Sequence, residues 1–96
     1  MFIVVTYDID QEDGGKRLRK VAKICESYGV RVQNSVFEMN LTGADLITLQ
    51  KRLRDTIDVT CDTIRIYKLG KIEKADIIMI GLVRKVELTM NDTIIL

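Results

Sequence analysis

Hydrophobic and polar positions follow two different periods along the first third of this chain. Phe2 to Val5 is a short, β-branched apolar run, which predicts a strand buried on both faces. From Lys16 to Tyr28 apolar side chains recur at helical spacing, which predicts an amphipathic helix. Gly29 suits the position just after a helix, where a left-handed backbone is common. The chain is therefore expected to begin with a strand followed by a helix.

The middle of the chain predicts more strand and a second helix. Residues Val30 to Met39 are rich in β-formers, which indicates either one strand or a hairpin that turns at Asn34 and Ser35. Thr42 is a good helix N-cap, and Asp45 lies three residues later as its capping-box partner. The residues that follow carry leucines at helical spacing, so a helix is expected there.

The remaining pattern predicts further strands and an apolar end. Asp62 to Leu69 alternates cleanly, residues 70–75 form a polar turn, and "DIIMIGLV" (76–83) indicates another strand. The final "TIIL" has no obvious partner in its own chain, which points to a partner elsewhere. We expect an α+β fold, a ferredoxin-like βαββαβ arrangement with an additional C-terminal strand. It would form a single domain over 1–96, with its core over about 2–70.

Composition narrows the choice of chemistry. The length of 96 residues fits one domain, and a net charge of +1 does not by itself mark a nucleic-acid binder. No signal peptide or membrane-spanning segment is visible, so a cytoplasmic protein without a membrane partner is expected. Cys25 and Cys61 both have the pattern of buried small hydrophobic residues. The absence of histidine excludes histidine-based catalysis and imidazole zinc sites, so any hydrolysis would need carboxylates and a hard metal ion.

Two motifs near the N-terminus fail on their spacing. An EF-hand loop that began at Asp8 would need glycine at its sixth position and glutamate at its twelfth, where Asp13 and Arg19 stand. The "GGK" sequence lacks the spacing of a phosphate-binding P-loop, and Arg17 replaces the required hydroxyl residue. The sequence therefore predicts neither an EF-hand nor a P-loop.

Asp8 is the carboxylate with most promise for catalysis. It falls at the C-terminal end of the first predicted strand, directly before a loop, where α/β layouts commonly meet ligands and metals. The alternative is that Asp8 and Asp10 only solvate the loop or favour entry into the helix. One carboxylate is also too few for a Mg²⁺ site, unless symmetry supplies another from a second copy.

A cationic stripe follows on the predicted helix. Lys16, Arg19, Lys20 and Lys23 fall on the side opposite the apolar residues, and no acid interrupts them before Glu26. Helices stabilised by ion pairs interleave opposite charges, which this one does not. A solvated surface is the plain alternative, but contact with phosphates explains the stripe better.

These segments together resemble a known family. "VVTYDI" at the first strand end, "KRLRKVAKICESYGVRVQNSVFE" and "DTIRIYKLG" are similar to the CRISPR-associated Cas-two family, small nucleases that partner the CRISPR spacer integrase. The resemblance covers about residues 2–70. It implies a sheet-on-sheet homodimer whose C-terminal residues (76–96) lie on the neighbouring sheet, and a site that needs Mg²⁺ (or Mn²⁺).

The resemblance also implies roles for particular residues. Asp8 is the catalytic and metal-binding position, meeting its symmetry mate across the two-fold axis. Tyr7, Ser35 and Phe37 match positions that flank the site. The nucleic-acid-binding residues would be Lys16, Arg17, Arg19, Lys20, Lys23 and Arg31, of which Arg17, Arg19 and Arg31 follow from the resemblance.

The sequence leaves several functions open. The leading hypothesis is a metal-dependent endonuclease, acting on RNA or DNA in CRISPR adaptation and binding duplex nucleic acid as a homodimer. The alternative is a non-catalytic DNA-bridging scaffold of the integrase complex, in which Asp8 is not used. A small-molecule regulator of ferredoxin-like fold is a third. The acidic loop residues Asp10, Glu12 and Asp13, with Asp10 standing where many relatives have proline, would either repel phosphate or help to recruit metal.

Overall fold

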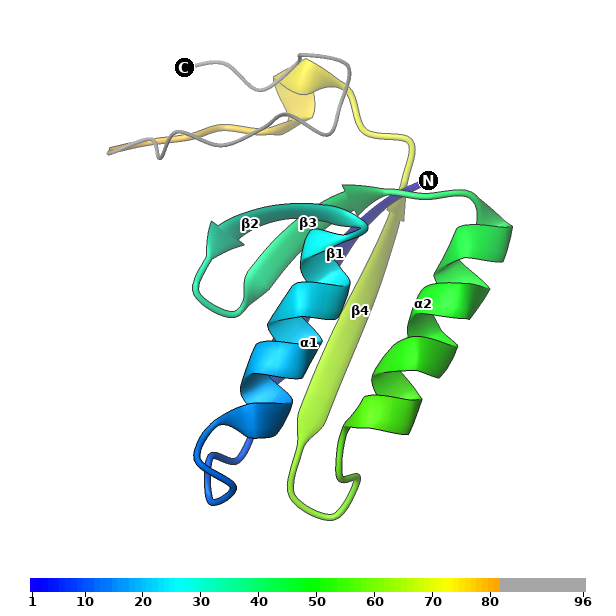
Figure 1. Ribbon diagram of the computed structural model, residues 1–96. Coiled ribbons are helices and arrows are strands. Elements are labelled where there is room, and N and C mark those ends of the chain that lie inside the picture. Colours follow the sequence, from blue (N-terminus) through cyan, green and yellow to red (C-terminus); the bar gives the residue numbers. More distant parts are fainter. Residues whose placement is uncertain (82–96) are drawn as a thin grey trace.

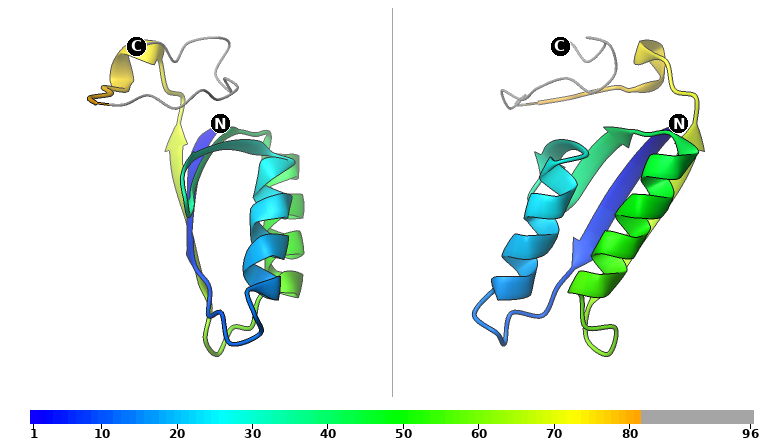
Figure 2. Two further views of the ribbon diagram at one scale, coloured as in Figure 1. Left: turned by 60° about the vertical axis from the view of Figure 1, so that its left-hand side comes forward. Right: turned by 45° about the vertical axis from the view of Figure 1, so that its right-hand side comes forward.

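The computed structural model describes residues 1–81 as a four-stranded antiparallel sheet covered on one face by two helices (Figures 1 and 2). The elements are β1 (Phe2–Asp8), α1 (Lys16–Glu26), β2 (Gly29–Gln33), β3 (Val36–Asn40), α2 (Gly43–Thr56), β4 (Thr63–Gly70) and a 3-10 helix η1 (Lys74–Asp76). The strand order is β2-β3-β1-β4. The predicted α+β fold of βαββαβ order is therefore confirmed.

The core lies between the sheet and the helices. Ile3, Val5 and Tyr7 of β1 are buried on the helix-facing side, because successive side chains of a strand point to opposite faces. Val4 and Thr6 point to the opposite side, which we call the open face, and are half-buried. Of the run Phe2–Val5 that was predicted to be buried on both faces, Phe2, Ile3 and Val5 are buried and Val4 is half-buried. The other members of the core cluster are Ile9, Val21, Cys25, Phe37, Met39, Leu41, Leu46, Leu49 and Leu53.

Two local predictions are confirmed. The β-rich middle segment is a hairpin, and its turn lies at Asn34 and Ser35 between β2 and β3. Thr42 is the N-cap of α2, and its hydroxyl oxygen accepts a hydrogen bond from the backbone N–H of Asp45 at 3.1 Å. That bond satisfies one of the backbone donors left without a partner at the start of a helix.

The end of α1 differs from the prediction. The helix ends at Glu26 with Ser27 as its C-cap, and Gly29 is the first residue of β2 rather than a left-handed residue after the helix. A Cβ atom at Gly29 would collide with the carbonyl oxygen of Glu38 and the side chain of Met39. This glycine is therefore required by the close approach of β2 to β3.

The structure also bears on the length of β1, the burial of the two cysteines and the predicted strand over residues 76–83. β1 continues through Asp8, three residues beyond the apolar run. Cys61 is exposed in the loop before β4, so its predicted burial is wrong, whereas Cys25 is buried as expected. Residues 77–81 form no strand within the single chain, and the rest of "DIIMIGLV" and the "TIIL" end lie outside the described residues. No helix in residues 1–81 is long and apolar enough to cross a membrane.

Candidate functional site on the open face of the sheet

Asp8 lies at the last position of β1, and its side chain is exposed at the end of the open face. It lines a surface pocket of about 410 Å³ with Thr6, Tyr7, Thr63, Arg65 and Tyr67, which we call the Asp8 pocket. The pairing of β1 with β4 builds this pocket, because it sets Asp8 opposite Thr63 and Thr6 opposite Arg65. The predicted position of Asp8 at a strand end is confirmed.

The walls of the Asp8 pocket are polar. Thr6 and Thr63 bring hydroxyl groups, and β4 adds a guanidinium and a phenol. Arg65 Nη1 donates a hydrogen bond to the phenol oxygen of Tyr67 at 3.3 Å, and this bond raises the pKa of Arg65. The pocket therefore combines an anion, a cation and neutral donors, a set that suits a phosphate ester and its counter-ion.

Asp8 is the one carboxylate that lines this pocket. Within residues 1–81, no three His, Cys, Asp or Glu side chains are grouped in a way that could hold a metal ion. Mg²⁺ nevertheless keeps several waters and is often bound through one or two carboxylates plus substrate phosphates. The oxygen donors of the pocket fit such an ion if water, substrate or a second copy of the chain completes its coordination.

The acidic loop after Asp8 has a structural role. The Asp13 carboxylate accepts hydrogen bonds from the backbone N–H groups of Gly15, Lys16 and Arg17 at 3.0–3.1 Å, which caps the start of α1. The bond from Arg17 is the main cause that lowers the pKa of Asp13. Gly14, just before α1, has a φ of 77°, a left-handed value that favours glycine. The pair Gly14 and Gly15 therefore allows the chain to turn before the helix begins.

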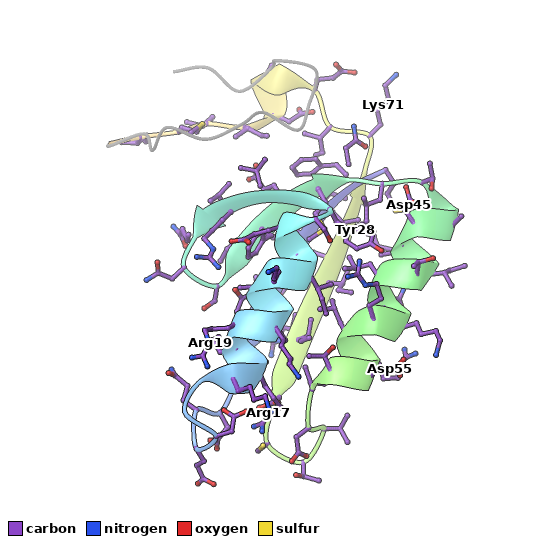
Figure 3. The ribbon with its side chains drawn as sticks, in the orientation of Figure 1. Arg17, Arg19, Tyr28, Asp45, Asp55 and Lys71 are labelled. Carbon is purple, nitrogen blue, oxygen red and sulfur yellow. The ribbon has the colours of Figure 1, made fainter. Side chains whose placement is uncertain are left out.

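A buried carboxylate, Asp62, ties this loop to the rest of the chain. Its side chain is fully buried and accepts hydrogen bonds from the backbone N–H groups of Asp10 and Asp58, each at 2.9 Å. Arg17 Nε donates to Asp62 Oδ2 at 2.8 Å, and this bond holds the pKa of Asp62 well below its ordinary value. Figure 3 shows Arg17 on the first turn of α1, near the loop that leads into β4. Sequence reasoning missed Asp62, because two of its three partners, Asp10 and Arg17, lie more than forty residues away along the chain.

The cationic stripe is exposed as predicted. Lys16, Arg19, Lys20 and Lys23 all lie at exposed positions of α1, while Val21 and Cys25 face the core. Arg19 also donates to the carbonyl oxygen of Gly14 at 3.0 Å, and Figure 3 shows it on the outer side of the helix. Because α1 packs on the helix-facing side of the sheet, the stripe and Asp8 lie on opposite sides of the molecule.

The two other predicted nucleic-acid-binding residues are engaged within the chain. Arg17 is paired with Asp62 and, at 3.2 Å, with Asp13. Arg31 lies over the ring of Phe37, with its guanidinium carbon 5.2 Å from the ring centre, and its nearest carboxylate partner is Glu26 at 3.7 Å. The structure therefore does not bring these two arginines into the stripe.

Of the three predicted flanking residues, Tyr7 lines the Asp8 pocket, whereas Ser35 and Phe37 are not among its lining residues. The rings of Tyr7 and Phe37 are buried on the helix-facing side, 6.2 Å apart between their centres, although Tyr7 also contributes to the wall of the Asp8 pocket. Burial raises the pKa of Tyr7, whose hydroxyl donates to the Asn34 carbonyl oxygen at 3.3 Å. The carbonyl oxygen of Ser35 accepts from the Tyr7 backbone N–H at 3.2 Å. These contacts fix the end of β1 beside the hairpin turn.

The fold and pocket define the class, an α+β protein of ferredoxin-like topology with a carboxylate at the end of a central strand. The chain belongs to the family of CRISPR associated protein Cas2, whose model matches residues 1–77. It is 46% identical over 83 residues to a CRISPR-associated endonuclease Cas2 of Halalkalibacterium halodurans, covering 84% of this chain and 86% of that protein. It is 48% identical to a CRISPR-associated endoribonuclease Cas2 of Moorella thermoacetica, over 72% of this chain and 74% of that one.

Solved structures show the same relationship. The crystal structure of Streptococcus pyogenes Cas2 matches with a TM-score of 0.74 at 46% identity, covering 84% of this chain and 100% of the other. A hypothetical protein from Thermus thermophilus matches with a TM-score of 0.72 at 34% identity, over 90% of this chain and 96% of that one. The family resemblance drawn from the sequence is confirmed.

Proposed function

We propose that this chain is a divalent-metal-dependent endonuclease of a CRISPR system, which hydrolyses phosphodiester bonds in RNA or DNA. The observation that carries the proposal is the Asp8 pocket, where an exposed carboxylate shares a polar cavity with Arg65 and two threonine hydroxyls. A chain without histidine has to rely on carboxylates and a hard cation for hydrolysis. The names of its relatives, endonuclease and endoribonuclease, support the same class of enzyme.

In this proposal Asp8 holds Mg²⁺ or Mn²⁺. A divalent cation bound there lowers the pKa of a coordinated water and offsets the charge of the phosphate. Asp8 contributes its carboxylate oxygens from the exposed strand end, where substrate can reach them. The backbone bonds that tie Tyr7 and Asp10 to neighbouring segments hold the strand end in place on either side of Asp8.

A homodimer would supply the second carboxylate. No helix in residues 1–81 covers the open face, where Val4 and Val36 are half-buried while Tyr67 is 44% exposed. A sheet face with such apolar side chains favours packing against another sheet. We propose a sheet-on-sheet dimer that brings two Asp8 residues together, with residues 76–96 contributing to the contact.

The second candidate function is that of a DNA-bridging scaffold for the CRISPR spacer integrase. One observation favours it: the cationic stripe lies on the side of the molecule opposite Asp8. A duplex that contacts the stripe of one protomer is separated from the Asp8 pocket of that protomer by the sheet. Under this proposal duplex binding and cleavage would use different surfaces, and the protein would bridge DNA without cutting it.

Metal removal and add-back test the proposed enzyme. Wild-type protein should cleave single-stranded RNA or DNA in Mg²⁺, lose the activity in EDTA and regain it when excess Mg²⁺ is added. Asp8→Asn should remain inactive in all three conditions and keep its fold by circular dichroism. Cleavage by the wild type that persists in EDTA would contradict the metal dependence, and duplex binding without any cleavage would favour the scaffold.

A further inference from the structure

We propose that Arg65, braced by Tyr67, is the phosphate-binding cation of the Asp8 pocket, an inference that rests on the proposed function. The sequence prediction did not include either residue. Both lie on β4, and both line the same cavity as Asp8. The pocket of one protomer then provides the carboxylate for the metal and a positive charge for the substrate.

The strand register places Arg65 and Asp8 at a useful separation. Asp8 is paired with Thr63 across the β1–β4 ladder, and Arg65 lies two residues further along β4 on the same face. The backbones of such diagonal neighbours in an antiparallel pair of strands are generally about 7–8 Å apart. A phosphate group between them can accept hydrogen bonds from the guanidinium while it faces the carboxylate side of the pocket.

The charge of Arg65 is not compensated by a carboxylate within the described residues, in contrast to the charges of Arg17 and Arg31. Arg17 pairs with Asp62 and Asp13, and Arg31 pairs with Glu26. The contact of Arg65 with the neutral phenol of Tyr67 uses one of its five N–H donors. The remaining donors form the planar fork that matches a phosphate.

Tyr67 acts as a positioning residue in this arrangement. Its hydroxyl oxygen accepts the hydrogen bond from Arg65 Nη1 at 3.3 Å, and it follows Arg65 by two positions on the same face of β4. An arginine at an exposed position otherwise samples many rotamers, which costs entropy when it binds a ligand. The phenol holds the guanidinium over the pocket before substrate arrives.

Steady-state cleavage kinetics test the role of Arg65 in the full-length protein with saturating Mg²⁺. Because a phosphate is held in both the ground state and the transition state, Arg65→Gln should raise KM by about tenfold or more. Arg65→Lys should recover part of the loss, and Tyr67→Phe should raise KM by a smaller factor. Arg54→Gln removes an exposed arginine of α2 outside the pocket and is the matched control, with KM within about twofold of wild type.

A titration with dimethyl phosphate, the simplest phosphodiester, separates this proposal from the proposed function. Backbone amide NMR signals of Thr63, Arg65 and Tyr67 should shift on addition of millimolar dimethyl phosphate, should stay in place in Arg65→Gln, and should shift normally in Arg54→Gln. If the wild type does not cleave nucleic acid but shows these shifts, the enzyme proposal fails while the anion site stands.

Two results would overturn the role of Arg65. One is an Arg65→Gln variant whose KM and amide shifts equal those of Arg54→Gln. The other is a loss of the dimer in Arg65→Gln, seen by sedimentation, with KM unchanged at protein concentrations that restore the dimer. The second result would assign Arg65 to the contact between copies rather than to substrate.

Discussion

Arg17 and Asp62 form a partly buried ion pair, with Arg17 Nε 2.8 Å from Asp62 Oδ2. The pair joins the first turn of α1 to the loop before β4, and Asp62 also accepts a backbone hydrogen bond from Asp10. Because Asp10 follows Asp8 by two residues, this pair braces the loop at the end of the strand that carries the proposed catalytic carboxylate. A residue that the family resemblance assigned to nucleic acid thus has a structural contact here.

The Arg17–Asp62 pair should appear in the dependence of stability on pH. Asp62 has a pKa lowered from 3.8, so the stability it contributes is present above about pH 4 and is lost as the pH falls below that value. Asp62→Asn should lower stability at pH 7 and flatten the acid side of the stability profile between about pH 4 and pH 2. Urea unfolding over this pH range measures both effects.

Asp55→Asn is the control for this experiment, because Asp55 is an exposed carboxylate that pairs with Lys51 at the surface of α2. Asp55→Asn should leave the stability at pH 7, and the loss of stability between about pH 4 and pH 2, close to those of the wild type. If Asp62→Asn and Asp55→Asn have the same profile, the ion pair does not contribute as the structure indicates.

The cationic stripe predicts a salt dependence for duplex binding. A dimer presents two copies of Lys16, Arg19, Lys20 and Lys23, and if half of these eight charges contact phosphates, the slope of log K against log salt should be about −3.6. Replacing Lys20 and Lys23 by Gln should make the slope shallower and weaken binding to all sequences alike. Fluorescence anisotropy over a series of salt concentrations provides the measurement.

The Arg17→Gln variant tests whether Arg17, which also lies on α1, contributes to duplex binding together with the cationic stripe. Since the Arg17 guanidinium is held by Asp62, its replacement should leave the salt slope nearly unchanged while it lowers stability. A slope as shallow as that of the Lys20 and Lys23 variant would show that Arg17 contacts phosphate after all. A flat salt dependence in the wild type would mean that the stripe is only solvated surface.

The Thr42 cap gives a prediction for stability alone. Thr42→Ala removes the acceptor for the Asp45 backbone N–H and should cost about 1 kcal/mol of unfolding free energy. In a domain of this size that corresponds to a drop of about 4–8 °C in Tm. Thr42→Ser keeps the hydroxyl and should stay close to the wild type. Equal melting temperatures for the alanine and serine variants would contradict the role of the cap.

Local chemistry explains which parts of the fold could be predicted. The turn at Asn34 and the cap at Thr42 depend on residues only a few positions apart, so both could be predicted from the local sequence. Asp62 and Arg65 depend on pairings across more than forty residues, and their roles emerge only when β4 lies beside β1. Cys61 was predicted to be buried because of its apolar neighbours in the sequence. It is exposed, in the loop that the contacts of Asp62 hold in place.

The dimer is tested by sedimentation. Full-length protein should sediment as a dimer at micromolar concentration, because the open face carries half-buried and exposed apolar side chains that a second sheet would cover. Deletion of residues 88–96 should shift the protein toward monomer or aggregate. A stable full-length monomer at micromolar concentration would remove the proposed source of the second Asp8.

The most direct measurement is the rate of Mg²⁺-dependent cleavage by two matched aspartate variants. Asp8→Asn removes the carboxylate of the pocket, whereas Asp10→Asn changes a carboxylate whose side chain accepts from the Glu12 backbone N–H within its own loop. We predict that Asp8→Asn abolishes cleavage while it retains the fold and the salt slope of duplex binding, and that Asp10→Asn cleaves nearly as fast as the wild type. Purified Asp8→Asn that cleaves at the wild-type rate would contradict the assignment of Asp8 as the catalytic residue.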